Sequence, residues 1–183
     1  MPGRLYRSNH PTPGRLARAA RRHGLRTVIN LRGEQPTGST TLSVAAAERL
    51  GLDHVFMAFE SRGAPQRDRI LRFHDIYRTM RTPALMHCKA GADRVALASG
   101  LAILFEGGTA AAALRQLSWR YLHFSRSGSG ILDAFFRHYA ADGEGRKPFL
   151  DWVREDYDEA ELRRRFHADR LSTFINDQVL VRE

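Results

Sequence analysis

The feature that most constrains the fold is the alternation of short apolar runs with helical patterns over residues 1–140. The runs are rich in β-branched residues, which is typical of strands buried on both faces of a sheet. The segments between them carry apolar residues at helical spacing, as Ile70, Phe73 and Tyr77 do. The sequence therefore predicts an α/β fold: a central, mostly parallel sheet of four to five strands flanked by helices. We expect the strands at 5–7, 27–31, 54–57 and 84–87.

Turn and capping residues predict where the helices begin and end. Gly24 and Gly51 are predicted C-terminal stops, and Thr109 and Ser129 are predicted N-caps. The segment after Arg94 is apolar on nearly all sides and rich in small residues, which predicts a central buried helix. The expected helices cover 13–23, 41–50, 65–80, 95–105, 109–117 and 129–140.

Length and composition fit one domain. Of the 183 residues 43% are apolar, and a chain of this size can bury most of the surface that it exposes when unfolded. Because no repeat or long linker divides it, we expect a single domain over 1–183, with a core of 1–145 and a helical C-terminal extension over 146–183. The residues expected to dock this extension are Phe149, Trp152, Val153, Leu162, Phe166 and Leu171.

The charge balance is strongly basic, with 29 Lys and Arg against 20 Asp and Glu and a formal net charge of +9. Such a chain attracts polyanions, whether nucleic acid, an anionic membrane surface or a multiply phosphorylated small molecule. The arginines are scattered over several predicted helices without helix-turn-helix or zinc-finger spacing, so we expect no stable nucleic-acid complex. Peripheral contact with an anionic membrane and the oligomeric state stay open.

From the sequence we expect neither a membrane span nor a secretion signal. No stretch approaches the roughly 18 uninterrupted apolar residues that a spanning helix needs. The first 30 residues contain seven arginines and no apolar h-region, so we expect a cytoplasmic protein. In that compartment the single cysteine, Cys88, is either a small buried hydrophobe or a candidate nucleophile.

Cys88 stands in a segment with unusual chemistry. A predicted strand ends at His87 and Cys88, five residues follow, and Arg94 then opens a predicted helix. A tight loop before a helix can turn its backbone N–H groups and the helix dipole toward an anion, and the same field stabilises a thiolate. The guanidinium of Arg94 can hold two phosphate oxygens, and Gly91 permits a backbone angle that other residues resist.

This segment resembles the signature of the cysteine-dependent protein tyrosine phosphatase superfamily, His-Cys-x-x-Gly-x-x-Arg followed by Ser or Thr. His87, Cys88, Gly91 and Arg94 fill its fixed positions. Residues 5–8 and 28–32 are similar to the opening strands of bacterial dual-specificity-like members, so the resemblance covers most of the first 140 residues. It implies a metal-independent phosphatase that hydrolyses a phosphate monoester through a cysteinyl-phosphate intermediate.

The resemblance also implies roles for individual residues. Cys88 is the expected nucleophile, and Arg94 is expected to stabilise the transferring phosphoryl group. Lys89 is expected to face the phosphate pocket, with a solvated lysine as the alternative. No cofactor is expected, and no metal, because the histidines lack metal-site spacing. The expected phosphate-binding residues are His87, Lys89, Ala90, Gly91 and Ala92. Arg32, which follows an earlier strand, is a further candidate for substrate binding, with an ordinary exposed arginine as its alternative.

The general acid is less clearly marked. Most members supply an aspartate from the loop after the strand that corresponds to 54–57, where this chain offers only Glu60. Asp93, inside the Cys88 loop, resembles the loop aspartate of myotubularin-type and bacterial lipid-active phosphatases, a proposed acid in those proteins. We favour Asp93, with a purely loop-stabilising role as its alternative. Glu60 is the second candidate, with a solvated loop carboxylate as its alternative.

One residue departs from the family pattern. Val95 stands where the family carries a hydroxyl that helps the cysteine sulfur leave, so we expect a slow second step. A phosphoanion-binding module with little turnover is therefore the alternative function, and a sulfurtransferase or reductase is a third. The open substrates are phosphoproteins, phospholipids, inositol phosphates and other polyphosphorylated molecules. Tyr121 and His123 are candidates to line the site or to serve in the core or at the surface, and 125–130 reads as a connector and helix cap.

Overall fold

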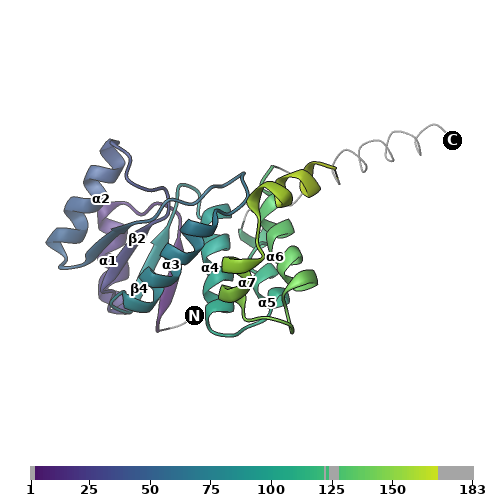
Figure 1. The fold of residues 1–183 in the computed structure, drawn as a ribbon. Coiled ribbons are helices and arrows are strands. Elements are labelled where there is room, and N and C mark those ends of the chain that lie inside the picture. The colour runs from purple at the N-terminus through teal and green to yellow at the C-terminus, as the bar shows by residue number, and fades with distance from the viewer. Residues whose placement is uncertain (1–2, 122, 124–127, 169–183) are drawn as a thin grey trace.

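The fold is known from a computed structural model that describes residues 3–121, 123 and 128–168. Four strands form one parallel sheet in the order β1-β4-β2-β3 (Figure 1). This confirms the predicted central parallel sheet flanked by helices, and each strand lies within one residue of its expected limits. The strands are β1 (Leu5–Ser8), β2 (Thr27–Asn30), β3 (Asp53–Phe56) and β4 (Ala84–His87).

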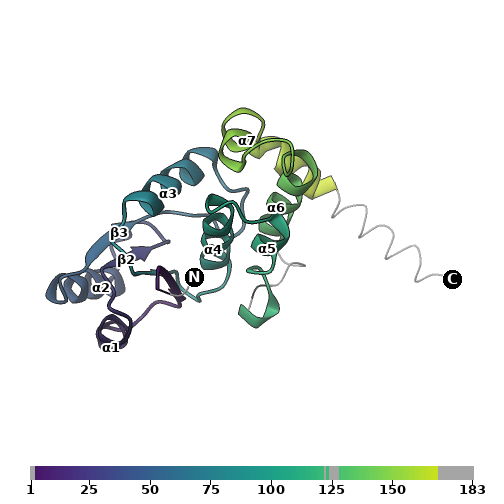
Figure 2. The same ribbon diagram turned by 90° about the horizontal axis from the view of Figure 1, so that it is seen from below.

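Helices cover both faces of the sheet. Helices α1 (Pro13–His23) and α2 (Gly38–Arg49) lie on one face, and α3 (Arg67–Thr79) and α4 (Asp93–Phe105) lie on the other (Figure 1). The remaining helices gather beyond α4, on its side away from the sheet, as Figure 2 shows from below. They are α5 (Ala110–Leu114), the short 3₁₀ helix η1 (Trp119–Tyr121), α6 (Gly130–Asp142) and α7 (Phe149–Glu155).

The two central strands explain the continuous apolar runs of the sequence. Successive strand residues point to opposite faces of a sheet. Val28 and Leu85 accordingly pack into the smaller core beneath α1 and α2, whereas Ile29 and Met86 belong to the larger core beneath α3 and α4. Every residue of β2 and β4 is buried, so neither face of these strands carries a solvent-exposed polar position.

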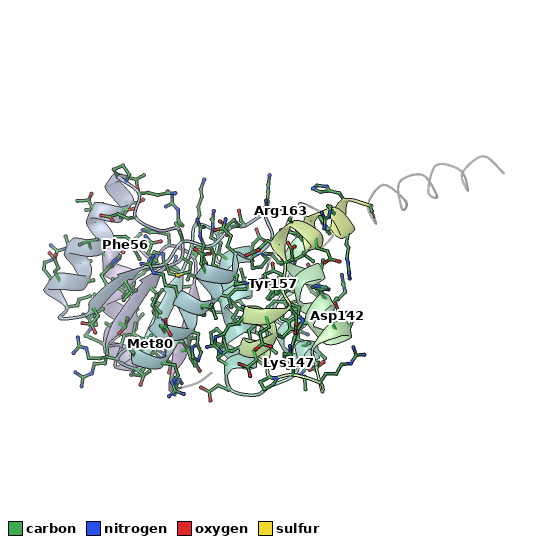
Figure 3. All side chains as sticks on the ribbon, viewed as in Figure 1. Phe56, Met80, Asp142, Lys147, Tyr157 and Arg163 are labelled. Carbon is green, nitrogen blue, oxygen red and sulfur yellow. The ribbon has the colours of Figure 1, made fainter. Side chains whose placement is uncertain are left out.

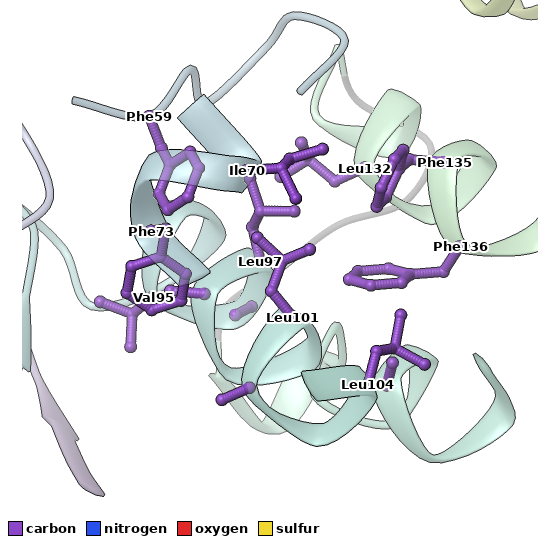
Figure 4. Close-up of a cluster of buried hydrophobic side chains, with 14 of the residues drawn as sticks. Phe59, Ile70, Phe73, Val95, Leu97, Leu101, Leu104, Leu132, Phe135 and Phe136 are labelled. Carbon is purple, nitrogen blue, oxygen red and sulfur yellow. The ribbon is translucent and has the colours of Figure 1, made fainter. Parts of the chain in front are cut away.

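Helix α4 is the centre of the larger core. It is enclosed by the sheet, α3, α5 and α7, which accounts for its nearly continuous apolar sequence. Figure 4 shows Leu97 and Leu101 between the α3 side chains and Phe136 of α6. The helix begins at Asp93, two residues before the expected start, so the last residues of the Cys88 loop already belong to its first turn.

The other helix limits differ modestly from expectation, for local reasons. Helix α2 starts earlier because the side chain of Thr37 accepts a hydrogen bond from the backbone N–H of Thr40 at 3.4 Å. Thr109 caps α5 as predicted, accepting from Ala112 N–H at 3.2 Å. Helix α5 ends short of residue 117 because the following turn has the i→i+3 hydrogen bonding of a 3₁₀ helix. In that turn Leu117 N–H donates to the carbonyl of Leu114.

The C-terminal segment packs into the larger core. Tyr157, labelled in Figure 3, donates from its hydroxyl to the carbonyl of Pro65 at 2.6 Å, and the backbone N–H of Arg67 donates to Glu159 Oε1 at 2.6 Å. These contacts hold residues 149–168, which include a second helical stretch at 159–168, against the start of α3. Of the expected docking residues, Phe149, Trp152, Val153 and Leu162 are buried, Phe166 is half-buried against the core, and Leu171 lies outside the described residues.

Within the described residues, no helix combines the length and the apolar character needed to cross a bilayer.

The contact between α4 and α6 gives a stability prediction. A Cβ added at Gly100 would lie 2.5 Å from Phe136 Cζ, so Gly100→Ala should destabilise the fold by about 1–3 kcal/mol through overpacking. Gly14→Ala in α1 is the matched control, because nothing lies within 4 Å of its Cβ position and alanine favours a helix. Thermal unfolding should show a melting temperature lowered by roughly 2–12 °C for Gly100→Ala only. Equal melting temperatures for the two variants would contradict this packing.

Candidate active site

The parallel sheet gathers the predicted site residues at one edge. In parallel strands all carboxyl ends meet at the same edge, which is where α/β proteins bind ligands. Cys88 follows β4, Arg32 follows β2 and Glu60 follows β3, while the segment after β1 lies beside the Cys88 loop. Residues distant in sequence are thus brought together by strand pairing.

The Cys88 loop is compact around the sulfur. Cys88 is 3% exposed, and its Sγ accepts a hydrogen bond from the backbone N–H of Gly91 at 3.2 Å. Gly91 has φ +77°, and a Cβ there would lie 2.7 Å from the backbone nitrogen of Asn9. Glycine is therefore required both by the backbone angle and by the close approach of the chain after β1.

Strand β1 and the segment after it hold this loop in place through two hydrogen bonds. The guanidinium of Arg7 donates through Nη2 to the carbonyl of Gly91 at 3.3 Å. The backbone N–H of His10 donates to the carbonyl of Lys89 at 3.2 Å. Lys89 and Ala90 are exposed, and Ala92 is buried with its carbonyl accepting the first hydrogen bond of α4. The loop therefore presents its middle to solvent while both ends are fixed.

Arg94 is oriented by the loop that follows β3. Its Nε donates to the carbonyl of Phe59 at 2.7 Å, which fixes the plane of the guanidinium. The two terminal nitrogens then form a fork of fixed direction, suited to binding two oxygens of an anion. Arg94 lies in the first turn of α4, so its charge and the positive end of the helix act in the same region.

Asp93 is held in a chain of hydrogen bonds that sequence reasoning did not find. Its Oδ1 lies 2.8 Å from His123 Nδ1, and His123 Nε2 lies 2.6 Å from Asp133 Oδ2. The His123 side chain is fully buried, Asp133 is 5% exposed and Asp93 is 28% exposed. Burial lowers the pKa of His123, but the hydrogen bonds to Asp133 and Asp93 outweigh it and raise that pKa to about 9. His123 is therefore an imidazolium at neutral pH.

A signal for Asp133 is present in the sequence. It stands in the apolar stretch from Ile131 to Phe136, where a carboxylate on a buried helix face needs a partner. Its partner, His123, is one of two residues, with Tyr121, that the sequence offers as candidates to line the site, and the proximity of His123 to Asp133 and Asp93 requires α6 to pack beside α4. The side chain of Tyr121 and residues 124–127 lie outside the described residues.

Glu60 has a different environment from Asp93. Its Oε1 forms an ion pair with Nη1 of Arg69, which also donates to the carbonyl of Ala58 at 3.2 Å. The carboxylate thus ties the loop after β3 to helix α3. Among the described residues, no hydrogen bond joins Glu60 to the Cys88 loop.

His87 is uncharged. Burial is the main cause that lowers its pKa to about 3, and the nearby charges of His10, His54 and Arg32 act in the same direction, while the backbone of Cys88 opposes them. The ring packs edge-on against His10 with centroids 4.7 Å apart. Arg32 itself donates from Nη2 to Gln35 Oε1 at 2.8 Å, so it lies near this edge of the sheet with its guanidinium partly engaged.

Val95 is fully buried in the larger core, beside Phe73 in Figure 4. At this position in the first turn of α4 the chain therefore has a buried apolar side chain where the family pattern has a hydroxyl. The sulfur of Cys88 has the Gly91 N–H as a hydrogen-bond donor instead. Within the described residues, no group of three or more His, Cys, Asp or Glu side chains is placed to hold a metal ion.

Comparison with known proteins identifies the family. Residues 4–103, more than half of the chain, match the family described as "DSP-PTPase phosphatase fused to NAD+ Kinase". The chain belongs to this family of dual-specificity-like phosphatases. No protein of curated function matches the chain in sequence.

Solved structures show the same fold at low sequence identity. TpbA of P. aeruginosa is 20% identical with a TM-score of 0.61, and the match covers 82% of this chain and 84% of TpbA. PTPMT1 is 15% identical with a TM-score of 0.56, covering 75% and 92% of the two chains. A putative phosphatase from Neisseria meningitidis is 20% identical with a TM-score of 0.55, covering 71% and 92%. TpbA has been crystallised with pTyr and PTPMT1 with PI(5)P.

The contact of Gly91 with Asn9 gives a prediction for the loop. Gly91→Ala should cost more stability than Gly145→Ala by about 1–3 kcal/mol, because both residues have φ +77° but only Gly91 would clash. Urea unfolding measures the difference. Inorganic phosphate should also protect Cys88 from iodoacetate in Gly145→Ala and not in Gly91→Ala. Equal stability and equal protection would show that the loop does not depend on this close approach.

Proposed function

We propose that this chain is a metal-independent phosphatase that hydrolyses phosphate monoesters through a cysteinyl-phosphate intermediate on Cys88. The observation that carries the proposal is the joint placement of Cys88 and Arg94. The sulfur lies buried in a loop at the start of α4 and accepts the Gly91 N–H, while Phe59 orients the guanidinium from the neighbouring loop. Family membership supports the same chemistry.

Two displacements make up the reaction. In the first, the thiolate of Cys88 attacks phosphorus, and the bond to the leaving oxygen breaks as that oxygen takes a proton. In the second, water attacks phosphorus, the sulfur leaves as thiolate, and inorganic phosphate is released. Arg94 and the loop N–H groups stabilise the charge on the three non-bridging oxygens in both steps.

Asp93 is the acid of the first step in this proposal. It is adjacent to Arg94 in the first turn of α4, and its side chain reaches solvent. Glu60 is paired with Arg69, and that arrangement suits a structural carboxylate. His87 is neutral and buried, and within the described part of the chain both of its ring nitrogens are without a hydrogen-bond partner, so it does not act as a base in this proposal.

The substrate class is a phosphorylated protein side chain or a phosphorylated lipid or inositol headgroup. The net charge of +9 favours multiply anionic substrates. The fold is shared with proteins crystallised with pTyr and with PI(5)P, which makes both ligand types reasonable first choices.

A second candidate function is a phosphoanion-binding module that turns over slowly. The buried Val95 favours it, because no hydroxyl at this position assists departure of the sulfur. The two functions share Cys88 and Arg94 and differ only in the rate of the second displacement.

The test of the proposal is phosphate release from 4-nitrophenyl phosphate. We expect Cys88→Ser to abolish release, and Arg94→Lys to lower it by roughly 100-fold or more because the planar fork is lost. Arg78→Lys, an exposed position on α3, is the control and should keep the wild-type rate. A burst of one product per chain followed by almost no turnover would favour the binding module. Full activity of Cys88→Ser would contradict both functions.

The assignment of the acid has its own test. Asp93→Asn should slow hydrolysis of alkyl phosphates by roughly 10²–10⁴-fold and that of 4-nitrophenyl phosphate far less, because only a basic leaving group needs a proton. Glu60→Gln should lower both rates equally, through loss of its ion pair with Arg69. If Glu60→Gln alone shows the dependence on leaving group, Glu60 is the acid and Asp93 is structural.

A further inference from the structure

Asp93, His123 and Asp133 form one hydrogen-bonded chain between α4 and α6, which we call the buried relay. Both ring nitrogens of His123 face a carboxylate, at 2.8 Å from Asp93 and 2.6 Å from Asp133. His123 and Asp133 are buried, and Asp93 is the most exposed of the three. Among the described residues, the charged groups that face His123 are Asp93 from α4 and Asp133 from α6. Asp93 is thus the end of the relay that reaches solvent.

A purely structural ion pair would need only one carboxylate, which is enough to neutralise a buried imidazolium. A buried ion pair on its own is also a weak source of stability. The second carboxylate is the residue beside Arg94, in the loop that our proposed function assigns to phosphate. The arrangement also sets a problem, because an Asp93 that remains a carboxylate beside an imidazolium has no proton to donate.

We propose that His123 is a positioning residue that stores the proton which Asp93 delivers to the leaving group. This inference rests on the proposed function and assigns the origin of its proton. Binding of a phosphate dianion next to Asp93 repels the carboxylate charge and favours the proton on Asp93. The Nδ1–H bond of His123 then breaks, its electron pair stays on the ring nitrogen, and an O–H bond forms on Asp93.

The remaining steps return the relay to its starting state. The Asp93 carboxyl turns about its Cβ–Cγ bond and gives the proton to the oxygen that leaves phosphorus, which leaves Asp93 ionised and His123 neutral. In the second displacement the attacking water loses a proton to Asp93, and that proton returns to His123 Nδ1. Asp133 accepts the hydrogen bond from the Nε2–H of His123 throughout, which keeps Nδ1 directed at Asp93.

The relay predicts a pH profile. Because the pKa of His123 is raised to about 9, the stored proton is present at neutral pH and is lost as the pH rises through about 9. In His123→Gln, which keeps a side-chain amide but stores no proton, the basic limb of kcat/KM should move to lower pH. The rate for phenyl phosphate should fall at least ten-fold more than the rate for 4-nitrophenyl phosphate.

Two further variants control this test. His138→Gln is the matched control, because His138 on α6 is also mostly buried and pairs with a carboxylate, Asp142, at 3.1 Å; it should change neither the limb nor the ratio of rates. Asp133→Asn should reproduce the His123→Gln pattern in milder form, which keeps the inference testable if His123→Gln does not fold. An equal fall on both substrates with an unmoved basic limb in Asp133→Asn would overturn the relay.

A spectroscopic measurement separates the relay from the proposed function. ¹⁵N NMR of the imidazole of His123 in the full chain at pH 7 should show both nitrogens protonated, and Nδ1 should lose its proton when inorganic phosphate is added. A chain that shows this change but hydrolyses no phosphate ester contradicts the proposed function alone. A chain that hydrolyses esters while His123 stays doubly protonated with phosphate bound contradicts the relay alone.

Discussion

The pairing of β4 between β1 and β2 is the constraint on which the rest of the structure depends. Because the strands are parallel and β4 is central, the residue after it emerges at the middle of the sheet edge, beneath the start of α4. The close approach of Asn9 to Gly91 follows from the register of β1 against β4, in which Ser8 pairs with His87. The shape of the Cys88 loop is therefore set by the sheet as well as by its own sequence.

Much of the fold could be predicted because its determinants are local. Strands buried on both faces leave continuous apolar runs, as in β2 and β4, and caps such as Thr109 mark helix ends within a turn. The short α5 and the early start of α4 could not be predicted, because both depend on how the chain packs after leaving the sheet. The docking of Tyr157 and Glu159 near the start of α3 could not be predicted either, because each residue contacts a partner 92 positions earlier in the sequence.

The candidate site likewise has residues that local sequence predicts and contacts that only tertiary packing determines. Cys88, Gly91 and Arg94 lie within seven positions of one another, so their spacing alone points to an anion-binding loop. The partners of the two candidate acids are set by tertiary packing: Asp93 meets a histidine 30 residues later, and Glu60 meets Arg69 on the next helix. Sequence reasoning could name both carboxylates, but not the charged groups beside them, on which their proposed roles depend.

The distribution of charge at the sheet edge favours one order of events in the proposed reaction. His87 is neutral and Arg94 is fixed by Phe59, so the loop offers a positive field near Cys88 before any anion arrives. The buried relay adds two carboxylates and one imidazolium, a net negative group next to that field. A bound phosphate dianion therefore meets attraction from Arg94 and repulsion from Asp93 at once, and moving one proton from His123 to Asp93 relieves the repulsion without changing the total charge. In the proposed reaction, the anion that is cleaved therefore also triggers protonation of its own acid.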